Sequence, residues 1–439
     1  MTVKRTTTRT IKVDALARVE GEGAITITFK GRVPLSAQLR IFEPPRFFEG
    51  FLQGRAITEV PDLTARICGI CPVAYQMSSV HALERALGVT VTPEIRALRR
   101  LLYCGEWIES HVLHMVMLHA PDFLGFPDGI TLAKTHGDLV RNALRVKKAG
   151  NAMVRLLGGR EIHPINVRLG GFYKVPDVDK FRAMVPELTW ARDTLCAIVK
   201  EMARWNFPDF ERDHIYVSLR HPDEYPFNEG RVVSSNGLDI PVDAWDQHFR
   251  EEHVQHSTAL HCGMVGHGPY LVGPLARFNL NADKLRPVAL ALARDIGLKA
   301  PVHNPFKMLL VRGVETVHAL DEALGIIAEM RPRQQDHVPC PPRAGVGMAA
   351  TEAPRGLLFH HYRVDDEGLV ETARIVPPTS QNQPSIEKDL LAIAARLPDM
   401  DHAAATTLAE QTVRNHDPCI SCSTHFLKLT LRQEQDPIP

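Results

Sequence analysis

Hydrophobic side chains recur with a helical period in several long segments of the chain. Between residues 93 and 119, Leu98, Leu101, Trp107 and Val112 follow the three-to-four spacing of one helix face, which predicts a helix that Pro121 ends. The same period predicts helices over residues 131–157, 183–205, 285–298 and 316–330, and two glycines at 158–159 supply a cap for the first of these. A core of long helices is therefore expected.

Strand patterns are shorter and begin near the N-terminus. The first 45 residues are interpreted as strands, because ARVEGEGAITITFKG (17–31) alternates apolar and polar side chains from Ile25 to Lys30. Residues 208–245 are polar and rich in Pro and Gly, with strand-like pieces such as HIYVSL, and residues 338–347 and 376–385 are expected to form loops. No internal repeat and no clear linker is present. We therefore predict one large domain of mainly α (α+β) class, with small β elements at its edges.

Composition narrows the class of protein. The chain has 439 residues, 44% of them hydrophobic, which is enough for a large core. Its 51 basic and 51 acidic residues give no surplus of positive charge for binding nucleic acid. No apolar run approaches the ~18 residues of a membrane helix, and MTVKRTTTRTIKV has no secretory h-region. These features predict a soluble, cytoplasmic protein.

Eight cysteines are too few for a disulfide scaffold, but four of them form two Cys-x-x-Cys pairs. The pairs are Cys68 with Cys71 and Cys419 with Cys422, and together they could hold zinc, nickel or iron in clusters. A structural zinc site usually brings its pairs together over ~15–20 residues, whereas here they lie near opposite ends of the chain. A redox dithiol is a further alternative. The other four are expected to be reduced and buried: Cys104, Cys196, Cys262 and Cys340.

The residues around both pairs, ARICGICPVAY (65–75) and DPCISCSTH (417–425), resemble the two nickel-binding signatures of the large, catalytic subunit of [NiFe] hydrogenases. Six further segments resemble this family in the same order: RVEGEG (18–23), PPRFFEGFLQGR (44–55), IESHVLHM (108–115), GGREIHPINVRLGGF (158–172), TEAPRG (351–356) and PPTSQNQPSIEKDL (377–390). The resemblance is greatest to the cytoplasmic bidirectional group, which includes the sulfhydrogenases. It implies the large-subunit fold with a long-helix core, and reversible cleavage of H2 into protons and electrons.

The resemblance also implies the metal ligands. By motif position, Cys68 and Cys419 are terminal nickel ligands, while Cys71 and Cys422 bind nickel and also bridge to iron. Carbon monoxide and cyanide would complete the iron. Four thiolates can hold the metals while positions stay open for reaction, as a catalytic site requires.

A second, redox-inert ion is implied as well. Glu49, His425 and the backbone of Gln383 match the family's ligands for a magnesium-like ion, although Glu49 alone would suggest an exposed helix carboxylate. His111 and His114 share a helix face and are expected to be buried, hydrogen-bonding residues near the site. Four other histidines match no metal motif and are expected to be solvated or core side chains: His253, His256, His261 and His267.

Heterolytic cleavage of H2 needs a Lewis acid for the hydride and a nearby base for the proton. By resemblance, the thiolate of Cys419 is the first base and Glu20 relays the proton. Arg355 would lie above the open metal position, held by Asp417. Without the resemblance, the same residues suggest a surface carboxylate, a loop ion pair and a turn-forming Asp-Pro.

Two residues depart from the family pattern. Tyr75 occupies a position where many relatives carry His, and its phenol can donate a similar hydrogen bond. Ser110 stands where many respiratory uptake enzymes have Asp, which removes a carboxylate beside Arg355. The second departure favours the bidirectional group.

Partner subunits follow from what the chain lacks. It has no further cysteine cluster motif and no Gly-x-Gly-x-x-Gly opening a βαβ unit, so electrons must leave through an iron–sulfur small subunit. Flavin/NAD(P)-binding and further Fe–S subunits are implied by the resemblance. So are nickel chaperones and a maturation endopeptidase that removes residues 426–439 after His425, leaving one domain over 1–425. The alternating KLTLR in this tail would otherwise suggest a short terminal strand.

Two other functions compete with the hydrogenase interpretation. A core subunit of respiratory complex I shares this fold and helps to form a quinone site, but it lacks the cysteine pairs. A scaffold protein with a structural four-cysteine zinc site is the third interpretation, and the identity of the metal would separate it from the first.

Overall fold

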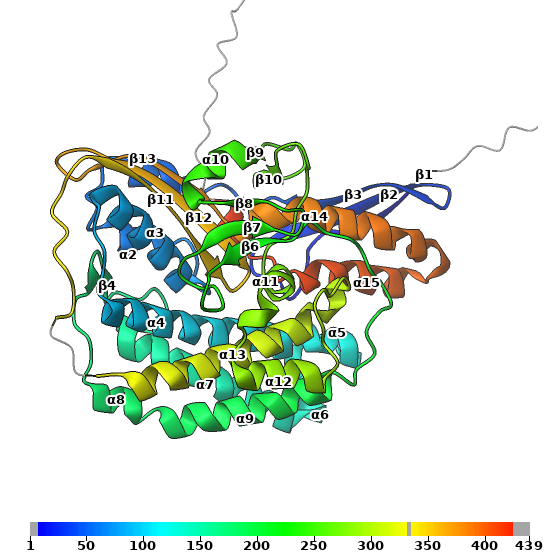
Figure 1. The fold of residues 1–439 in the computed structure, drawn as a ribbon. Coiled ribbons are helices and arrows are strands. Elements are labelled where there is room, and N and C mark those ends of the chain that lie inside the picture. Colours follow the sequence, from blue (N-terminus) through cyan, green and yellow to red (C-terminus); the bar gives the residue numbers. More distant parts are fainter. Residues whose placement is uncertain (1–7, 332–334, 425–439) are drawn as a thin grey trace, which may run out of the picture.

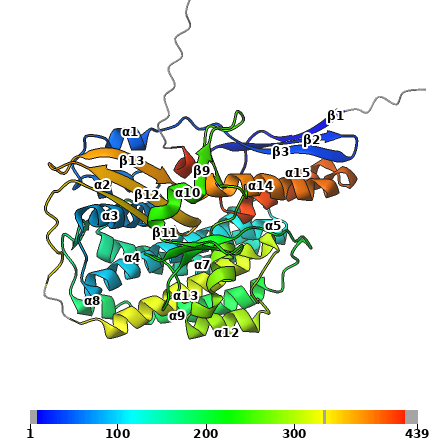
Figure 2. The same cartoon turned by 45° about the horizontal axis from the view of Figure 1, so that its top comes forward.

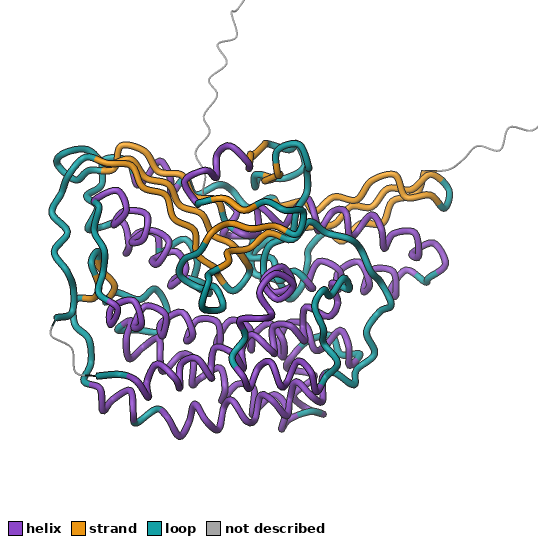
Figure 3. The backbone as a smooth tube through the Cα atoms, viewed as in Figure 1, coloured by secondary structure: helices purple, strands orange, loops and turns teal. Residues whose placement is uncertain are grey.

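The computed structural model describes residues 8–331 and 335–424. Its base is a layer of long helices, on which strands and shorter helices lie (Figures 1 and 3). The main helices of this layer are α4 (Pro93–Val112), α7 (Gly137–Gly158), α9 (Val185–Met202), α12 (Pro287–Asp295) and α13 (Met308–Glu329). The predicted long-helix core is confirmed.

Helix boundaries differ from the prediction where the backbone departs from the α-helical period. The helix that begins with α4 continues through a π-helical segment, Leu113–His119, into α5 (Ala120–Leu124). Pro121 therefore does not end it, because in the first turn of α5 its missing N–H costs no hydrogen bond. The predicted helix at 131–157 is divided at His136 into α6 (Gly129–Thr135) and α7. Gly159, with φ of 88°, caps α7 as expected.

A buried antiparallel sheet lies above the helical layer. It consists of β11 (Gly345–Ala353), β12 (Gly356–Val364) and β13 (Val370–Val376), and β11 packs closely against α3 (Pro72–Leu87). A side chain at Gly347 would lie only 1.9 Å from the carbonyl oxygen of Ala82, so only glycine permits this approach. Small β elements were expected at the edges of the domain, and β11 and β12 add mostly buried strands to them, which lack the alternation that reveals exposed ones.

The predicted N-terminal strands are confirmed as a second sheet, β1 (Thr8–Val13), β2 (Gly23–Lys30) and β3 (Val33–Ile41), in that order. Ile25, Ile27 and Phe29 are buried against α14 (Pro378–Ile393) and α15 (His402–Asn415), which lie along the sheet in Figures 1 and 2. Most of the predicted loop 376–385 is instead the start of α14. Its polar side chains bond to other segments, so they show no apolar period.

Smaller elements complete the fold. A third sheet contains β6 (Val217–Arg220), β7 (Arg231–Ser234) and β8 (Asp239–Ile240), followed by the hairpin of β9 (Phe249–Glu252) and β10 (His261–Met264). Short elements connect the layers: α1 (Phe48–Leu52), α2 (Val60–Thr64), β4 (Val167–Arg168), β5 (Gly171–Phe172), α8 (Val178–Arg182), α10 (Trp245–His248) and α11 (Pro274–Asn281). Cys104 and Cys262 are buried thiols as expected, whereas Cys196 and Cys340 are only half-buried. Among the residues that the structure describes, no helix is both long and apolar enough to cross a bilayer.

Candidate metal centre

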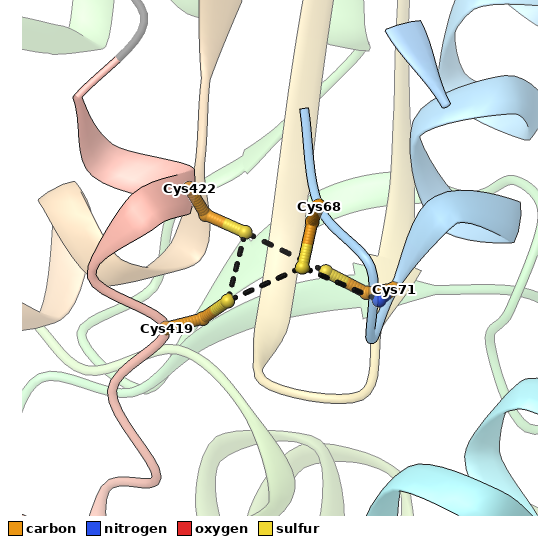
Figure 4. A group of neighbouring side chains, drawn as sticks. All are labelled: Cys68, Cys71, Cys419 and Cys422. Atoms are coloured by element: carbon orange, nitrogen blue, oxygen red, sulfur yellow. Dashed lines mark hydrogen bonds between the residues drawn. The ribbon is translucent and has the colours of Figure 1, made fainter. Parts of the chain in front are cut away.

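The four paired cysteines meet in the interior, although they come from opposite ends of the chain (Figure 4). Cys68 and Cys71 lie between α2 and α3, and Cys419 and Cys422 follow α15. Their Sγ atoms are 3.3 Å apart for Cys68 and Cys419, 3.6 Å for Cys71 and Cys422, and 3.0 Å for Cys419 and Cys422. All four residues are at most 4% exposed.

Hydrogen bonds fix the first pair. The Sγ of Cys68 accepts from the backbone N–H of Cys71 at 3.4 Å, which tightens the loop. Glu106 on α4 accepts from the N–H groups of Val73 and Ala74 at 2.6 and 3.1 Å, and so occupies the N-terminus of α3. Free N–H groups at a helix start attract an acceptor, so α4 holds the end of α3 that carries Cys71.

The second pair is fixed by the N-terminal segment and by α14. The N–H of Cys419 donates to Thr379 Oγ1 at 3.1 Å, and the N–H of Ile420 donates to the carbonyl of Glu20 at 3.0 Å. Thr379 is buried at the start of α14. The polar sequence that begins α14 therefore serves the site and not the apolar core.

Glu20 is in direct contact with the cysteine cluster. Its Oε2 lies 3.1 Å from Cys419 Sγ and accepts the N–H of Ser421 at 3.0 Å, while its Oε1 accepts the Ser421 hydroxyl at 2.5 Å. Ser421 Oγ also lies 3.5 Å from Oε1 of Glu43, which is half-buried. A row of hydrogen-bonding atoms thus leads away from the thiol of Cys419.

Arg355 lies in the turn between β11 and β12 and is fully held by neighbours. Its Nε donates to the carbonyl of Asp417 at 2.8 Å, one Nη donates to Asp417 Oδ1 at 3.0 Å, and the other donates to Ser110 Oγ at 3.3 Å. Burial by itself would lower the pKa of Arg355, but Asp417 and the thiols of Cys419 and Cys71 raise it well above its ordinary value. A fixed, buried positive charge therefore lies beside the cysteines.

Two buried histidines from the end of α4 and the π-helical segment flank this arrangement. His114 Nε2 donates to the carbonyl of Arg414 at 2.9 Å and lies 4.0 Å from Asp417 Oδ1. His111 Nε2 lies 3.3 Å from Glu315, and burial lowers the pKa of His111 to about 4. Burial likewise lowers the pKa of His114 well below its ordinary value, so both rings are neutral polar neighbours of the site.

The residues expected to hold a second ion lie on several elements. Glu49 on α1 accepts the backbone N–H of Ile375 on β13 at 2.7 Å. Gln383 lies inside α14, where its side chain accepts from Ser257 at 3.1 Å. His425 lies outside the described residues.

Tyr75 donates to the carbonyl of Cys422 at 3.5 Å, and burial, followed by the charges of Cys422 and Cys71, raises its pKa well above the ordinary value.

The donor set fits a thiophilic metal. Four thiolates at about 2.3 Å from one metal would lie about 3.8 Å apart in a tetrahedron. The observed Sγ distances of 3.3, 3.6 and 3.0 Å are shorter, so the sulfurs already lie close enough together to bind one metal after a small separation. Hydrogen bonds from Cys419, Cys422 and Cys71 hold the pKa of Cys68 well below its ordinary value, while bonds with Cys422 and Cys68 raise that of Cys419. The cluster already favours one thiolate, and a cation would favour the others.

Comparison with known proteins decides which metal chemistry this is. The nickel-dependent hydrogenase family matches residues 46–136 and 294–425, which include both cysteine pairs. The chain belongs to this family. Sulfhydrogenase 1 subunit alpha of Pyrococcus furiosus is 32% identical over 95% of this chain and 98% of its own, and the NAD-reducing hydrogenase HoxS subunit beta of Cupriavidus necator is 26% identical over 95% of each chain. A solved structure of an NAD+-reducing [NiFe]-hydrogenase in the H2-reduced state superimposes with a TM-score of 0.84 at 27% identity, covering 95% of this chain and 99% of that one.

The protein is accordingly the catalytic large subunit of a [NiFe] hydrogenase, and its cysteine quartet suits a nickel–iron centre. The predicted family, fold class and enzyme class are confirmed. The scaffold interpretation loses its basis, because the quartet lies within matched family segments. The complex I interpretation fails on the presence of the cysteines themselves.

Four residues used in the site were not predicted from the sequence, and one of them is Glu43, which directly precedes the segment 44–55 that resembles the family. Ser421 lies between the two cysteines of the second pair, Thr379 lies in a segment that resembles the family, and Glu106 lies in the predicted first helix. Proximity to the motifs was a usable signal for Ser421 and Thr379. Glu106 gave none, because only the fold places its carboxylate at the start of α3.

Proposed function

We propose that this subunit performs reversible heterolytic cleavage of H2 at a centre held by Cys68, Cys71, Cys419 and Cys422. One observation carries the assignment of roles: four buried sulfurs converge, and one of them has a carboxylate oxygen 3.1 Å away. Cys68 and Cys419 would be terminal nickel ligands, and Cys71 and Cys422 would also bridge to an iron that carries carbon monoxide and cyanide. When bound, this centre supplies the Lewis acid that polarises H2 and accepts its electrons.

The chain's own residues manage the proton. The Sγ of Cys419 is the first base, and its contact with Glu20 allows the proton to pass to Oε2 without rearrangement. The Ser421 hydroxyl, 2.5 Å from Oε1 of Glu20 and 3.5 Å from Glu43, offers the next step toward the half-buried Glu43. The same hydrogen bonds orient Glu20 before any proton arrives.

Arg355 would act by position and charge. Three hydrogen bonds to Asp417 and Ser110 leave its guanidinium no freedom to swing away from the cysteines. A preoriented cation stabilises negative charge beside it without reorganisation. Ser110 keeps one of these bonds where the uptake enzymes would supply a carboxylate.

We also propose that the subunit binds a second, magnesium-like ion and that its C-terminal tail is removed during maturation. Glu49, the backbone of Gln383 and His425 would hold a magnesium-like ion. Residues 426–439 would be removed after His425 by an endopeptidase once nickel chaperones have loaded the metal, which would leave a single domain over residues 1–425.

Electrons would leave through an iron–sulfur small subunit and then through flavin and further Fe–S subunits to NAD(P). Support comes from the relatives, which are named as subunits of sulfhydrogenase and of NAD-reducing hydrogenase. A cytoplasmic location is part of the same proposal, as the resemblance to the cytoplasmic bidirectional group implies. The alignments cover nearly the whole of this chain and of each relative, which supports assigning the relatives' electron acceptor to this chain.

Metal content tests the proposal. Protein purified without oxygen from its native host is expected to contain about one nickel per chain and to oxidise H2. Cys419→Ser should abolish activity and lower the nickel content, whereas Cys104→Ser, which changes a buried cysteine outside the quartet, should do neither. Zinc in place of nickel, in chains that already end at His425, would refute the proposal.

A further inference from the structure

A second group of metal-ligating side chains lies where the β9–β10 hairpin meets α14. His256 lies in the loop that connects the two strands, His261 begins β10, and Glu387 lies on α14. One ligand atom from each of the three lies within 4.8 Å of the other two. His256 Nε2 is 2.7 Å from Glu387 Oε1, and the two imidazole rings are 5.5 Å apart.

The backbone that carries the two histidines is fixed on both sides. Thr258 N–H donates to the carbonyl of Ile41 at the end of β3 at 2.8 Å. Ser257 Oγ donates to Gln383 at 3.1 Å, one helical turn before Glu387. The loop therefore holds its position relative to α14 without a ligand, so little chain entropy would be lost when one binds.

One nitrogen of this group is unsatisfied. His261 is 5% exposed, and its Nε2 has no hydrogen-bond partner among the described residues. A buried polar atom without a partner is destabilising, so native structures rarely keep one without a reason. Glu387 and His256 are 17% and 20% exposed, which gives an ion a route from solvent.

We propose that His256, His261 and Glu387 bind a divalent transition-metal ion of the zinc class. Two imidazoles and a carboxylate are a donor set that zinc accepts, and three protein ligands leave a fourth position for water. Imidazole nitrogen disfavours magnesium and calcium, which prefer oxygen. The ion would replace the hydrogen bond between His256 and Glu387 and would release a proton to solvent if that imidazole carries one on the ligating nitrogen.

Such an ion would join the hairpin loop to α14 beside the catalytic segment. Ala259, within the same loop, packs against Ile41 and against Ile420, the residue that follows Cys419. The proposed site shares no residue with the cysteine quartet. The ion would therefore stabilise the packing of the hairpin loop against Ile420, beside Cys419, and would not take part in the reaction.

The test uses the matured, nickel-loaded protein, so that the quartet is already filled. Loosely held metal is removed with EDTA, Zn2+ is titrated back, and metal per chain is measured by mass spectrometry after gel filtration. Wild type is expected to retain about one zinc per chain at micromolar concentration. Glu387→Gln and His261→Gln should each weaken retention at least ~10-fold, with nickel unchanged. His267→Gln, an exposed histidine just beyond β10, is the matched control and should retain zinc.

The results separate the possibilities clearly. Absence of retained zinc in wild type, or equal retention in all variants, would overturn the proposal. X-ray absorption at the zinc edge of the wild-type protein gives an independent answer if His261→Gln does not fold. A shell of nitrogen and oxygen with imidazole scattering is expected, whereas sulfur ligands would refute the site.

Discussion

Replacing Glu20 with Gln isolates the proton step, because it removes a proton acceptor and keeps the shape of the side chain. Glutamine can retain its oxygen toward the N–H or the hydroxyl of Ser421, which now lie at 3.0 and 2.5 Å. It cannot carry the proton that leaves Cys419 across the 3.1 Å contact. The loop that holds the second cysteine pair should therefore keep its position while proton transfer fails.

The expected magnitude follows from the role. A positioned general base contributes about 10²–10⁴-fold to a rate, which is roughly 3–5 kcal/mol of activation free energy. Glu20→Gln should lower H2 oxidation with an artificial electron acceptor by this factor. Glu20→Asp retracts the carboxylate by about one C–C bond, 1.5 Å, and breaks direct contact with Cys419, so an intermediate loss is expected.

The assay measures H2 oxidation, isotope exchange between D2 and water, and nickel content of each variant. Exchange with water should fall together with turnover in Glu20→Gln, and nickel should stay near the wild-type value. Glu22→Gln, an exposed carboxylate in the same segment, is the control and should be fully active. Wild-type exchange in a nickel-loaded Glu20→Gln variant would refute the assignment of Glu20 as relay.

Two further predictions concern the buried charges. Arg355→Lys cannot hold Asp417 and Ser110 together with one ammonium group, so turnover should fall about 10²–10³-fold in the H2 oxidation assay while nickel is retained; unchanged turnover would contradict a positioning role. Burial alone would raise the pKa of Glu315, but the charge of Arg277 outweighs burial and lowers the pKa to about 2. The ionised carboxylate therefore stabilises the fold at pH values above its unfolded pKa. This contribution is lost as the pH falls toward 2. Glu315→Gln should cost on the order of 3 kcal/mol in urea unfolding at pH 7, with a deficit that shrinks below about pH 5; a deficit independent of pH would contradict the ion pair.

The sequence was sufficient for the helical core and for the cysteine quartet, for different physical reasons. The long helices bury one face each, so their period survives in the sequence, as in residues 183–205 for α9. The cysteine pairs are spaced for two ligands on one loop, and the segments around them resemble a known family. Neither signal depends on contacts between distant parts of the chain.

The parts that failed depend on such contacts. The β11–β12 strands pack on both faces, and α14 begins with polar residues that bond outward, for example Thr379 to Cys419. The π-helical segment has no local signature that separates it from an α-helix. Likewise the pairing of His256 with Glu387 joins residues far apart in sequence, so four scattered histidines gave no metal motif.

The buried charges argue that the site is built for an anionic metal–thiolate group. Burying a guanidinium such as Arg355 costs several kcal/mol unless opposite charge surrounds it. Asp417 provides one negative charge at 3.0 Å, yet Asp417 adopts a left-handed backbone conformation, with φ of 51°, and leaves its Oδ2 buried without a hydrogen-bond partner among the described residues. A fold selected for stability alone would not keep this strained, partly unsatisfied pair. The arrangement is explained if Arg355 also faces the negative charge of the quartet's thiolates. Its positive charge then balances those thiolates as well as Asp417. Stability and catalysis would therefore respond differently to the removal of this pair. Replacing both residues by apolar side chains should leave the free energy of unfolding near the wild-type value and should abolish H2 oxidation.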